Sequence, residues 1–407
     1  MKILVLNAGS SSQKSCLYQI DNTLPDLPPE PLWEASVDWT HHAGVASITI
    51  KTAQGVVTEE LPNNSRPQVI SHLLNTLTEG TGVITDLSEI NIVGHRVVHG
   101  GEEYREATLI TPQVKDAIER LSTFAPIHNP ANLEGVEAIE QVLPDVPQVA
   151  VFDTAFHRQL PLYAAIYPGT YEWFEQGIRR YGFHGISHSY CAQRTAQLLQ
   201  QDLQSLRLIV CHLGNGCSLA AIQSGVSIDT TMGFTPLDGL MMGSRSGSID
   251  PSILIYLLRE QGFDADKLDH LLNYESGLKG ISGISGDMRQ IQSAIASGNS
   301  RAKLAFDIYV HSLRKHIGAM LASLGGLDAL IFTGGVGENQ SDVRALACEA
   351  FGFIGIKLDS NKNAQSPPDS DIATLDSTVR VLIVHTQEDW AIATQCWNLA
   401  HQLSIIN

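Results

Sequence analysis

The sequence has few basic residues for its length. Its 407 residues include 26 Lys and Arg against 43 Asp and Glu, which gives a formal net charge of −17. Nucleic acids and anionic membrane surfaces attract proteins that present a basic face. We therefore expect neither a nucleic acid nor a membrane among the partners, and a few local cations would have to hold any anionic ligand.

Cysteine is scarce and long hydrophobic runs are absent. The first apolar segment, residues 3–6, is far shorter than the core of a signal peptide, and no run approaches the ~20 residues of a membrane span. The cysteines form no C-x-x-C pair, and a chain of this length needs no disulfides. We expect reduced core thiols, and hence a cytoplasmic protein, from Cys16, Cys191, Cys211, Cys217, Cys348 and Cys396.

The length favours two domains, because a chain of 407 residues exceeds one typical hydrophobic core. Segments rich in Val, Ile and Leu alternate with helical patterns, which predicts an α/β fold. One helix is expected to start at Asp250-Pro251, where an acidic cap precedes proline. A second helix is expected over 303–324 and should end at Gly325-Gly326. Surface loops are expected at 21–31, 142–148 and 361–371. The expected strands are 2–6, 90–98, 148–152, 206–212, 327–332 and 379–385.

A weak internal repeat connects the two halves of the chain. The segment LVLNAGSSSQKSCLYQI from residue 4 resembles IVCHLGNGCSLAAIQSG from residue 209. Each has an apolar strand, a turn with glycine and polar residues, and a second apolar strand. The pattern predicts a duplicated domain whose two turns face one cleft, with a junction between Asp153 and a helix starting near Ser187. Two unrelated hairpins would give the same pattern.

Three turns rich in glycine follow expected strands, at 7–12, 212–216 and 332–339. Backbone N–H groups in such turns can approach phosphate oxygens closely. The P-loop pattern and a full G-x-G-x-x-G are both absent, which excludes two common nucleotide-binding folds. The turns therefore favour phosphate binding on a different fold.

Two arginines and two acids stand in unusual settings. Arg96 and Arg245 lie beside small residues in segments that regular packing does not explain, and we interpret both as functional candidates, although arginine often pairs with a carboxylate for structural reasons. Asp153 and Glu388 each follow a strand of buried type, where an acid needs a partner or a metal.

The histidines of HGISH, His184 and His188, have a spacing found in zinc sites. The motif lacks the glutamate of H-E-x-x-H, and no third ligand is evident. A structural role for these two histidines is therefore favoured, and a zinc site is the less favoured alternative.

Eight motifs together resemble the acetate kinase family, in order and spacing over nearly the whole chain. They are NAGSSSQK, GHRVVHGG, VFDTAFH, YGFHGISH, CHLGNG, DTTMGFTPLDGLMMGSRSGSIDP, SGISGDMR and FTGGVGEN. The resemblance implies two duplicated RNase-H-like domains, as in actin-like ATPases, with the nucleotide in the cleft between them. We accordingly expect one domain of residues 1–155 plus 389–407 and another of residues 156–388.

The resemblance also implies roles for the reacting groups. Asn7 and Glu388 would help to hold Mg²⁺, with Mn²⁺ as an alternative. Arg96 and Arg245 would bracket the transferred phosphoryl group. The remaining catalytic residues would be His184, a donor at the transition state, and Asp153, the catalytic carboxylate.

Further positions match the family's ligand contacts. A methyl pocket would be lined by Val98, Ile127, Phe183 and Pro236, although leucine is expected at Ile127. ATP or ADP would contact Lys14, Ser10, Ser12, His212, Leu213, Gly214, Asn215, Gly216, Asp287, Met288, Arg289, Gly335, Val336, Gly337, Glu338 and Asn339.

The implied reaction is reversible transfer of a phosphoryl group from ATP to acetate, giving acetyl phosphate, in a homodimeric enzyme. Acetate is already ionised at neutral pH, so no base is needed to make the nucleophile, and charge neutralisation becomes the main task. We therefore interpret Asp153 as orienting an arginine or a metal-bound water. The alternatives are a propionate or butyrate kinase, and an actin- or Hsp70-like ATPase that acts on a protein partner.

Overall fold

The computed structural model describes residues 1–9, 12–42, 44–62 and 65–403. The chain divides into two compact units, unit 1 of Met1–Ala155 with Gln387–Asn407, and unit 2 of Phe156–Thr386. The sequence-based division had its boundaries after residues 155 and 388.

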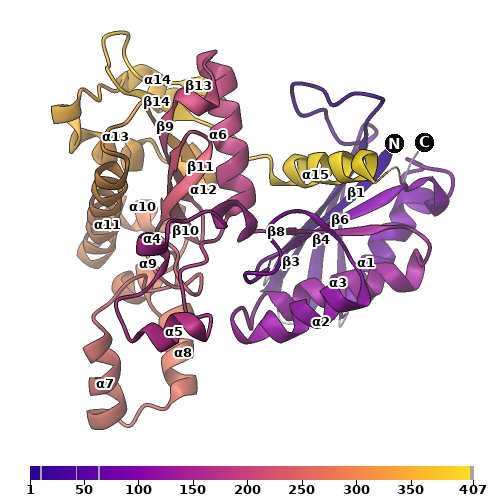
Figure 1. Ribbon diagram of the computed structural model, residues 1–407, viewed down its shortest axis with the longest axis horizontal. Coiled ribbons are helices and arrows are strands. Elements are labelled where there is room, and N and C mark those ends of the chain that lie inside the picture. Colours follow the sequence, from indigo (N-terminus) through magenta and orange to yellow (C-terminus); the bar gives the residue numbers. More distant parts are fainter. Residues whose placement is uncertain (10–11, 43, 63–64, 404–407) are drawn as a thin grey trace. The chain divides into compact units, whose positions relative to one another are not determined.

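Unit 1 is built on a sheet that has eight strands in the described residues, in the order β5-β4-β3-β2-β1-β6-β8-β7. Helix α15 lies on one face, and α1, α2 and α3 lie on the other (Figure 1). The strands are β1 (Lys2–Ala8), β2 (Ser12–Gln19), β3 (Trp33–His42), β4 (Val45–Thr52), β5 (Gly55–Pro62), β6 (Ile92–Val97), β7 (Thr108–Leu109) and β8 (Gln148–Phe152), and the helices are α1 (Arg66–Asn75), α2 (Pro112–Arg120), α3 (Asn129–Val142) and α15 (Glu388–Gln402).

Unit 2 has a smaller sheet, of six strands where the structure describes the chain, in the order β11-β10-β9-β12-β14-β13. Its strands are β9 (Arg207–Leu213), β10 (Cys217–Gln223), β11 (Val226–Thr230), β12 (Ala329–Thr333), β13 (Ser370–Asp371) and β14 (Arg380–Ile383). Its helices are α4 (Leu162–Ala165), α5 (Tyr171–Glu175), α6 (Gly185–Leu199), α7 (Pro251–Glu260), α8 (Ala265–Tyr274), α9 (Gly277–Ser282), α10 (Met288–Ala296), α11 (Ser300–Leu324), α12 (Gly334–Asn339), α13 (Ser341–Glu349) and α14 (Ser360–Gln365).

The two sheets share one topology, which confirms the repeat seen in the sequence. In unit 1, β1 pairs antiparallel with β2 and parallel with β6, which in turn pairs parallel with β8. In unit 2, β9 pairs antiparallel with β10 and parallel with β12, which pairs parallel with β14. Even the short edge strands correspond, since β7 and β13 each run antiparallel to their neighbour.

Helix caps follow the sequence closely. Asp250 caps α7 by accepting a hydrogen bond from the backbone N–H of Ser252 at 2.8 Å. Helix α11 ends at Gly325, whose φ of 64° is the left-handed conformation that glycine adopts most easily. The expected cysteine state is also confirmed, because all six thiols are free and buried.

One expected loop is wrong. Residues 361–371 contain most of α14 and the edge strand β13. Asp359 caps α14 through the backbone N–H groups of Asn361 and Lys362. The buried Arg344 then binds the side chain of Asn363 at 2.8 Å. These contacts offset the low helix propensity of a segment rich in Asn, Ser and Pro.

A glycine lets α15 pack closely on the sheet of unit 1. A Cβ added at Gly94 in β6 would lie 2.6 Å from Cys396 Sγ and 2.7 Å from Ile392 Cγ2, closer than real Cβ contacts. Any larger residue would push the helix outward. The start of α15, with Glu388 and Asp389, is thereby held beside the ends of β1 and β6.

Buried histidines give the fold a pH dependence. Burial lowers the pKa of His95, His99 and His157 to about 4. An unfolded histidine binds its proton near pH 6.5, so between that pH and about 4 the unfolded state binds more protons. The stability that these neutral histidines contribute is therefore fully present above pH 6.5. Below that pH, the free energy of unfolding should fall by up to ~1.4 kcal/mol per pH unit for each histidine.

The expected result is a melting temperature that falls as the pH is lowered from about 6.5 to 4.5, measured by thermal unfolding. His95→Gln, which retains a donor for Gln148, should make that slope shallower. His270→Gln replaces an exposed histidine and should leave the slope unchanged. An equal slope in all three proteins would contradict the assignment.

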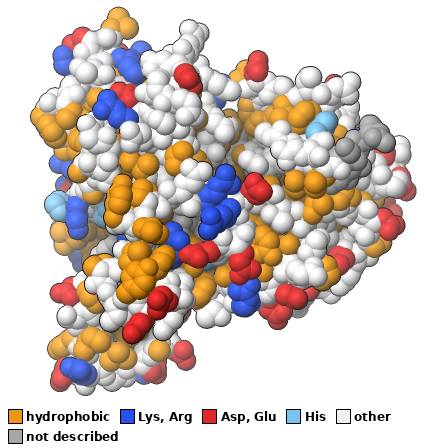
Figure 2. Space-filling model, in the orientation of Figure 1, with side chains coloured by type: hydrophobic (Ala, Val, Ile, Leu, Met, Phe, Trp, Pro, Cys, Tyr) orange, Lys and Arg blue, Asp and Glu red, His pale blue; other side chains and the backbone are white. Residues whose placement is uncertain are grey.

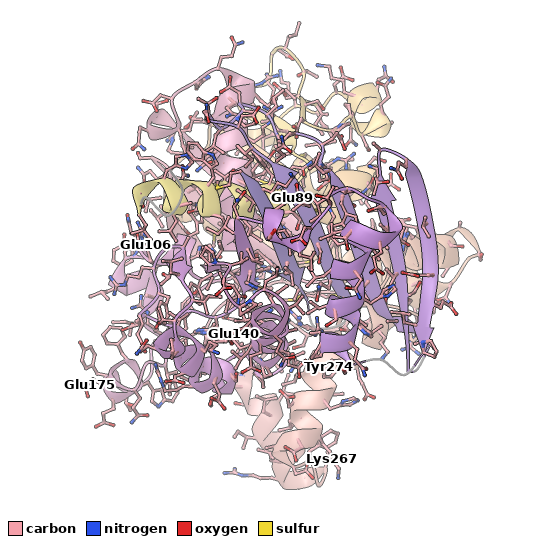
Figure 3. The ribbon with its side chains drawn as sticks, turned by 90° about the vertical axis from the view of Figure 1, so that its right-hand side faces the viewer. Glu89, Glu106, Glu140, Glu175, Lys267 and Tyr274 are labelled. Atoms are coloured by element: carbon pink, nitrogen blue, oxygen red, sulfur yellow. The ribbon has the colours of Figure 1, made fainter. Side chains whose placement is uncertain are left out.

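The surplus acidic residues lie mainly at the surface, as Glu89, Glu106 and Glu140 in unit 1 illustrate (Figure 3). Glu89 pairs with Lys2 at 2.5 Å and Glu140 pairs with Lys115 at 2.6 Å. Exposed ion pairs of this kind add little stability. Among the helices in the described ranges, none has both the length and the hydrophobicity that crossing a membrane requires.

Candidate active site

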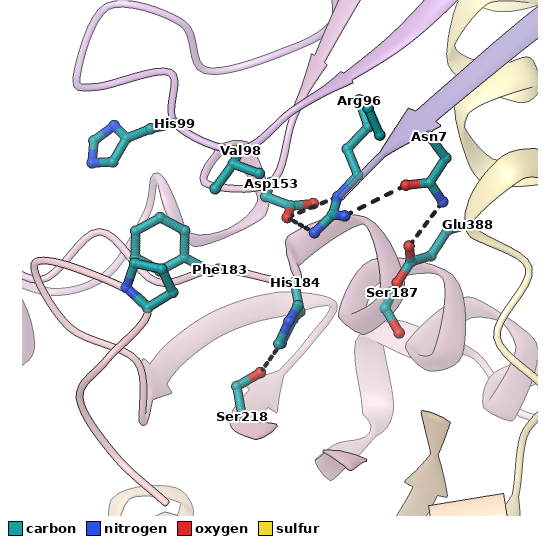
Figure 4. Close-up of polar contacts among 12 residues, drawn as sticks. Asn7, Arg96, Val98, His99, Asp153, Phe183, His184, Ser187, Ser218 and Glu388 are labelled. Atoms are coloured by element: carbon teal, nitrogen blue, oxygen red, sulfur yellow. Dashed lines mark hydrogen bonds and ion pairs between the residues drawn. The ribbon is translucent and has the colours of Figure 1, made fainter. Parts of the chain in front are cut away.

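The functional residues of unit 1 gather at one edge of its sheet. Asn7 lies near the end of β1, Arg96 lies near the end of β6, and Asp153 directly follows β8. These three strands are parallel, so their carboxyl ends meet at the same edge. Figure 4 shows Arg96 between Asp153 and Asn7, with Glu388 next to Asn7.

Arg96 and Asp153 form a buried ion pair. Arg96 donates from Nε at 3.1 Å and from Nη2 at 2.6 Å to the same Asp153 oxygen, Oδ2. The side chains are 15 % and 2 % exposed. Burial alone would lower the pKa of Arg96, but the charges of Asp153 and Glu388 outweigh it and raise that pKa above its ordinary value. The ion pair holds the positively charged guanidinium of Arg96 in a fixed orientation.

Asn7 links this pair to two acids at the start of α15. Its amide nitrogen donates to Glu388 Oε2 at 3.1 Å and to Asp389 Oδ1 at 3.0 Å. Its amide oxygen accepts a hydrogen bond from Arg96 Nη1 at 3.4 Å. The proposed metal residues Asn7 and Glu388 are thus neighbours, although 381 positions separate them in the sequence.

Asp389 is a site residue that the sequence reasoning missed. It is 4 % exposed, and it pairs with Lys14 Nζ at 3.0 Å. Burial alone would lower the pKa of Lys14, but Asp389 raises that pKa above its usual range. The only signal in the sequence was the acid pair Glu388-Asp389 before an apolar helical pattern, which is also typical of an ordinary solvent-exposed helix start.

Asn7, Arg96 and Glu388 line a cavity of about 510 Å³ within unit 1. Gly9 and Ser12 of the first hairpin also line it, together with Lys14 of β2. Ser12 is exposed, as a phosphate contact must be, whereas Ser10 lies outside the described residues. The cavity offers Lys14 and Arg96 for an anion and amide and carboxylate oxygens for a hard cation.

In unit 2, the second hairpin forms a tight turn between β9 and β10. The backbone N–H of Gly214 donates to the carbonyl of Gly216 at 3.0 Å, and the intervening Asn215 is exposed. A Cβ on Gly216 would lie 3.4 Å from Arg245 Nη1 and 3.6 Å from His184 Nε2. The turn therefore brings Arg245 and His184 to one spot.

The loop that carries Arg245 packs on the same turn. The backbone N–H of Gly243 donates to the Asn215 carbonyl at 3.1 Å, and a Cβ on Gly243 would lie 2.3 Å from Asn215 Oδ1. Arg245 Nη1 donates to the carbonyl of Pro236 at 3.2 Å. Glycine at 243 thus permits the close approach that positions the guanidinium.

His184 has an unusual backbone conformation at the N-cap of α6. Its φ of 56° and ψ of 25° are left-handed, which costs a residue with a Cβ free energy. Its ring stacks on His212 with centroids 4.3 Å apart, and its Nδ1 lies 2.9 Å from Ser218 Oγ. The surrounding contacts therefore maintain a strained residue, which is typical of a functional position.

The zinc alternative finds no support in the described chain, where no three His, Cys, Asp or Glu side chains are arranged to hold a metal. His184 and His188 instead converge on one hydroxyl, that of Ser218, at 2.9 and 2.7 Å. The four-residue spacing reflects a shared hydrogen-bond partner.

Several residues expected to bind the nucleotide hold the local structure. Glu338 turns back to its own helix start, accepting from the backbone N–H of Gly334 at 2.9 Å, and it contacts His385 Nδ1 at 2.6 Å. Asp287 caps α10 and pairs with Arg289 at 2.6 Å. Leu213 and Met288 are buried, so their side chains are not available to a ligand. The remaining positions, Gly335, Val336, Gly337 and Asn339, lie in α12.

The four residues of the expected methyl pocket are divided between the units. Val98, which is 2 % exposed, and the half-buried Ile127 belong to unit 1. Phe183, which is 1 % exposed, and the half-buried Pro236 belong to unit 2. Each unit thus supplies one buried apolar side chain within two positions of a candidate catalytic residue, Val98 near Arg96 and Phe183 before His184.

Comparison with known proteins identifies close relatives over the full chain. Residues 2–394 match the Acetokinase family. The chain is 66 % identical over 401 residues to an acetate kinase of Cyanothece sp., covering 98 % of both proteins. It is 65 % identical over 400 residues to an acetate kinase of Gloeobacter violaceus, covering 98 % of this chain and 99 % of that protein.

Two solved structures share the fold over nearly the whole length. Porphyromonas gingivalis acetate kinase has a TM-score of 0.89 at 40 % identity, covering 98 % of this chain and 99 % of that one. A propionate kinase from Francisella tularensis also has a TM-score of 0.89, at 38 % identity and with the same coverage.

Proposed function

The chain belongs to the acetokinase family, and we propose on this basis that it transfers a phosphoryl group from ATP to acetate. The fold is the duplicated actin-like ATPase fold of the related kinases. The observation that carries the proposal is the buried pair of Arg96 and Asp153, which forms one polar network with Asn7 and Glu388. This network combines a cation for phosphoryl oxygens with oxygen ligands for a metal.

The reaction needs charge neutralisation more than it needs proton transfer. Acetate is an anion at neutral pH, and it must approach the negatively charged γ-phosphate. Positive groups fixed in advance lower this barrier because they need no reorganisation during the reaction. In unit 1 the residue proposed to supply such charge is Arg96, and in unit 2 it is Arg245.

Asp153 acts by orienting Arg96. Its Oδ2 accepts two hydrogen bonds from the guanidinium, and its side chain is almost fully buried. No proton must leave the carboxylate nucleophile, so a general base has no task in this step. Asp153 instead fixes the plane and the charge of the arginine.

The residues of unit 1 fit a magnesium ion. Mg²⁺ prefers oxygen ligands and is usually held by one or two carboxylates together with substrate phosphates. Glu388 and the amide oxygen of Asn7 are such ligands, with Asp389 beside them. When bound, the ion would neutralise charge on the phosphates of ATP. Mn²⁺ has similar ligand preferences.

Replacing Glu388 with alanine is expected to raise the Mg²⁺ concentration required for half-maximal activity, because an anionic ligand or its water-mediated contact is lost. The measurement is a Mg²⁺ titration at saturating ATP and acetate. Glu34→Ala is the control, since Glu34 lies 3.8 Å from Lys14 and is not one of the proposed ligands. A lower kcat with an unchanged Mg²⁺ dependence would give Glu388 another role.

Acyl-chain selectivity is expected to depend on Val98. If the buried Val98 limits the acyl pocket, acetate should be preferred, and an extra methylene should cost ~1–3 kcal/mol, or about 10- to 200-fold in kcat/KM. Val98→Ala should raise kcat/KM for propionate relative to acetate. Measurements with acetate, propionate and butyrate test this, and equal wild-type values for acetate and butyrate would favour the longer-chain kinase.

The phosphorylation itself is tested by trapping the product. With ATP, Mg²⁺ and acetate, the purified protein should form an acyl phosphate that hydroxylamine converts to a hydroxamate. ATP hydrolysis without hydroxamate would indicate an actin- or Hsp70-like ATPase instead.

We propose a homodimer whose interface includes α7. This helix exposes Ile253, Ile255, Tyr256 and Leu258, each more than 40 % accessible. Figure 2 shows hydrophobic side chains at the surface in the region of α7 and α8. Light scattering should give twice the mass of the chain, and a monomer would contradict the proposal.

The free buried thiols support a cytoplasmic location.

A further inference from the structure

The hydroxyl of Ser218 has two imidazole partners. Its Oγ lies 2.9 Å from Nδ1 of His184 and 2.7 Å from Nε2 of His188 (Figure 4 shows the contact to His184). Ser218 and His188 are both fully buried. This site rests on β10 and α6 within unit 2, and no catalytic step described above uses Ser218 or His188.

One hydroxyl carries one proton, and Ser218 Oγ has no other hydrogen-bond partner among the described residues, so the two contacts are coupled. If Ser218 donates to His184 Nδ1, it accepts a hydrogen bond from Nε2–H of His188. If it donates to His188 Nε2, it accepts from Nδ1–H of His184. The first arrangement places the proton of neutral His184 on Nε2, and the second leaves Nε2 as a bare acceptor. The state of His188 therefore determines the state of His184.

The surroundings of His188 select the first arrangement. Its Nδ1 is buried and has no hydrogen-bond partner among the described residues. Burial and the neighbouring rings of His157 and His212 lower the pKa of His188 well below its ordinary value, so the ring is neutral and carries one proton. A buried N–H without an acceptor is rarer than an unsatisfied acceptor, so the proton belongs on Nε2, which faces Ser218.

We propose that Ser218 and His188 are positioning residues that hold neutral His184 in the tautomer with its proton on Nε2. The inference rests on the proposed role of His184 as a donor at the transition state. The backbone of His184 is strained, and its ring stacks on His212, so its plane is fixed as well. Its Nε2–H then lies beside Gly216 and Arg245, where negative charge develops on the transferred group.

The tautomer can be measured directly in the wild-type protein. Long-range proton–nitrogen correlation spectra of ¹⁵N-histidine-labelled enzyme distinguish a protonated from a bare ring nitrogen, and His184→Gln assigns the signal. We expect the proton of His184 on Nε2 at neutral pH. A proton on Nδ1 would overturn the proposal, whatever reaction the enzyme catalyses.

Ser218→Ala tests the effect on catalysis. Without the hydroxyl, His184 should populate both tautomers, and kcat should fall by up to about 10²-fold, as expected for a misplaced donor, with little change in KM for acetate or ATP. Ser218→Thr retains the hydroxyl and should recover much of kcat together with the Nε2–H signal.

Ser227→Ala is the matched control. Ser227 is also fully buried, and its Oγ lies 2.8 Å from Nδ1 of His157, so this variant removes the same group from a second serine–histidine pair. It should leave the His184 tautomer and kcat unchanged. Equal losses of kcat in Ser218→Ala and Ser227→Ala, or a Ser218→Ala enzyme with the wild-type tautomer, would show a merely structural role. If the wild-type protein forms no hydroxamate, that result would instead refute the proposed reaction.

Discussion

Replacing Arg96 with alanine is expected to lower kcat by ~10³-fold or more, the scale found when an arginine that stabilises a transferred phosphoryl group is removed. The reason is local, because Arg96 is the cation that Asp153 and Asn7 hold at the end of β6. Steady-state rates of acetyl phosphate formation provide the measurement. Near-normal turnover in the purified variant would remove Arg96 from the mechanism.

This variant should also lose stability, which a control must separate from catalysis. Without Arg96, the nearly fully buried Asp153 would lose this ion pair, and breaking a buried pair typically costs about 3–5 kcal/mol. Arg96→Ala combined with Asp153→Asn removes the buried negative charge as well. The double variant should regain much of the melting temperature while kcat remains low. Recovery of both would mean that the single variant was inactive only because it was unstable.

Replacing Arg245 with alanine should reduce kcat to a similar extent, again by ~10³-fold or more. The guanidinium lies beside Gly216 of the second hairpin and is fixed by the Pro236 carbonyl, so its charge is available to a bound phosphate. Here we expect little change in melting temperature, since the guanidinium donates to the backbone carbonyl of Pro236.

The controls for Arg245 vary charge and position. Arg245→Lys retains the charge but not the planar, two-pronged donor, so it should recover only part of the activity. Arg120→Ala removes an exposed arginine of α2 and should have wild-type rates. A loss in Arg120→Ala as large as in Arg245→Ala would point to a general effect of net charge.

Strand ends were the most predictable part of the site. The turns after β1 and β9 could be recognised because a branched apolar run followed by glycine and serine has few other structures available to it. Asp153 could be recognised for a related reason, since an acid directly after a fully buried strand requires a partner. The sequence argument left open whether that partner is an arginine or a metal-bound water, and the structure shows Arg96.

Side-chain partners across long separations could not be predicted from the residues alone. Asp389 contacts Asn7 and Lys14 only because α15 returns to the first sheet. Ser218 looked like an ordinary strand residue, and its contacts to two histidines depend on the register between α6 and β10. Such contacts arise from tertiary packing, on which local sequence patterns carry little information.

The return of α15 to unit 1 has a consequence for biosynthesis. The chain is made from its N-terminus, so β1 and β6 leave the ribosome long before the helix that covers them. At ~5–20 residues per second, the apolar face around Gly94 stays uncovered for on the order of ten seconds or more while all of unit 2 is synthesised. The nascent first unit thus exposes a hydrophobic surface to chaperones or to other nascent chains. The proposed metal site of unit 1, with Asn7 and Glu388, is completed only when Glu388 has been synthesised.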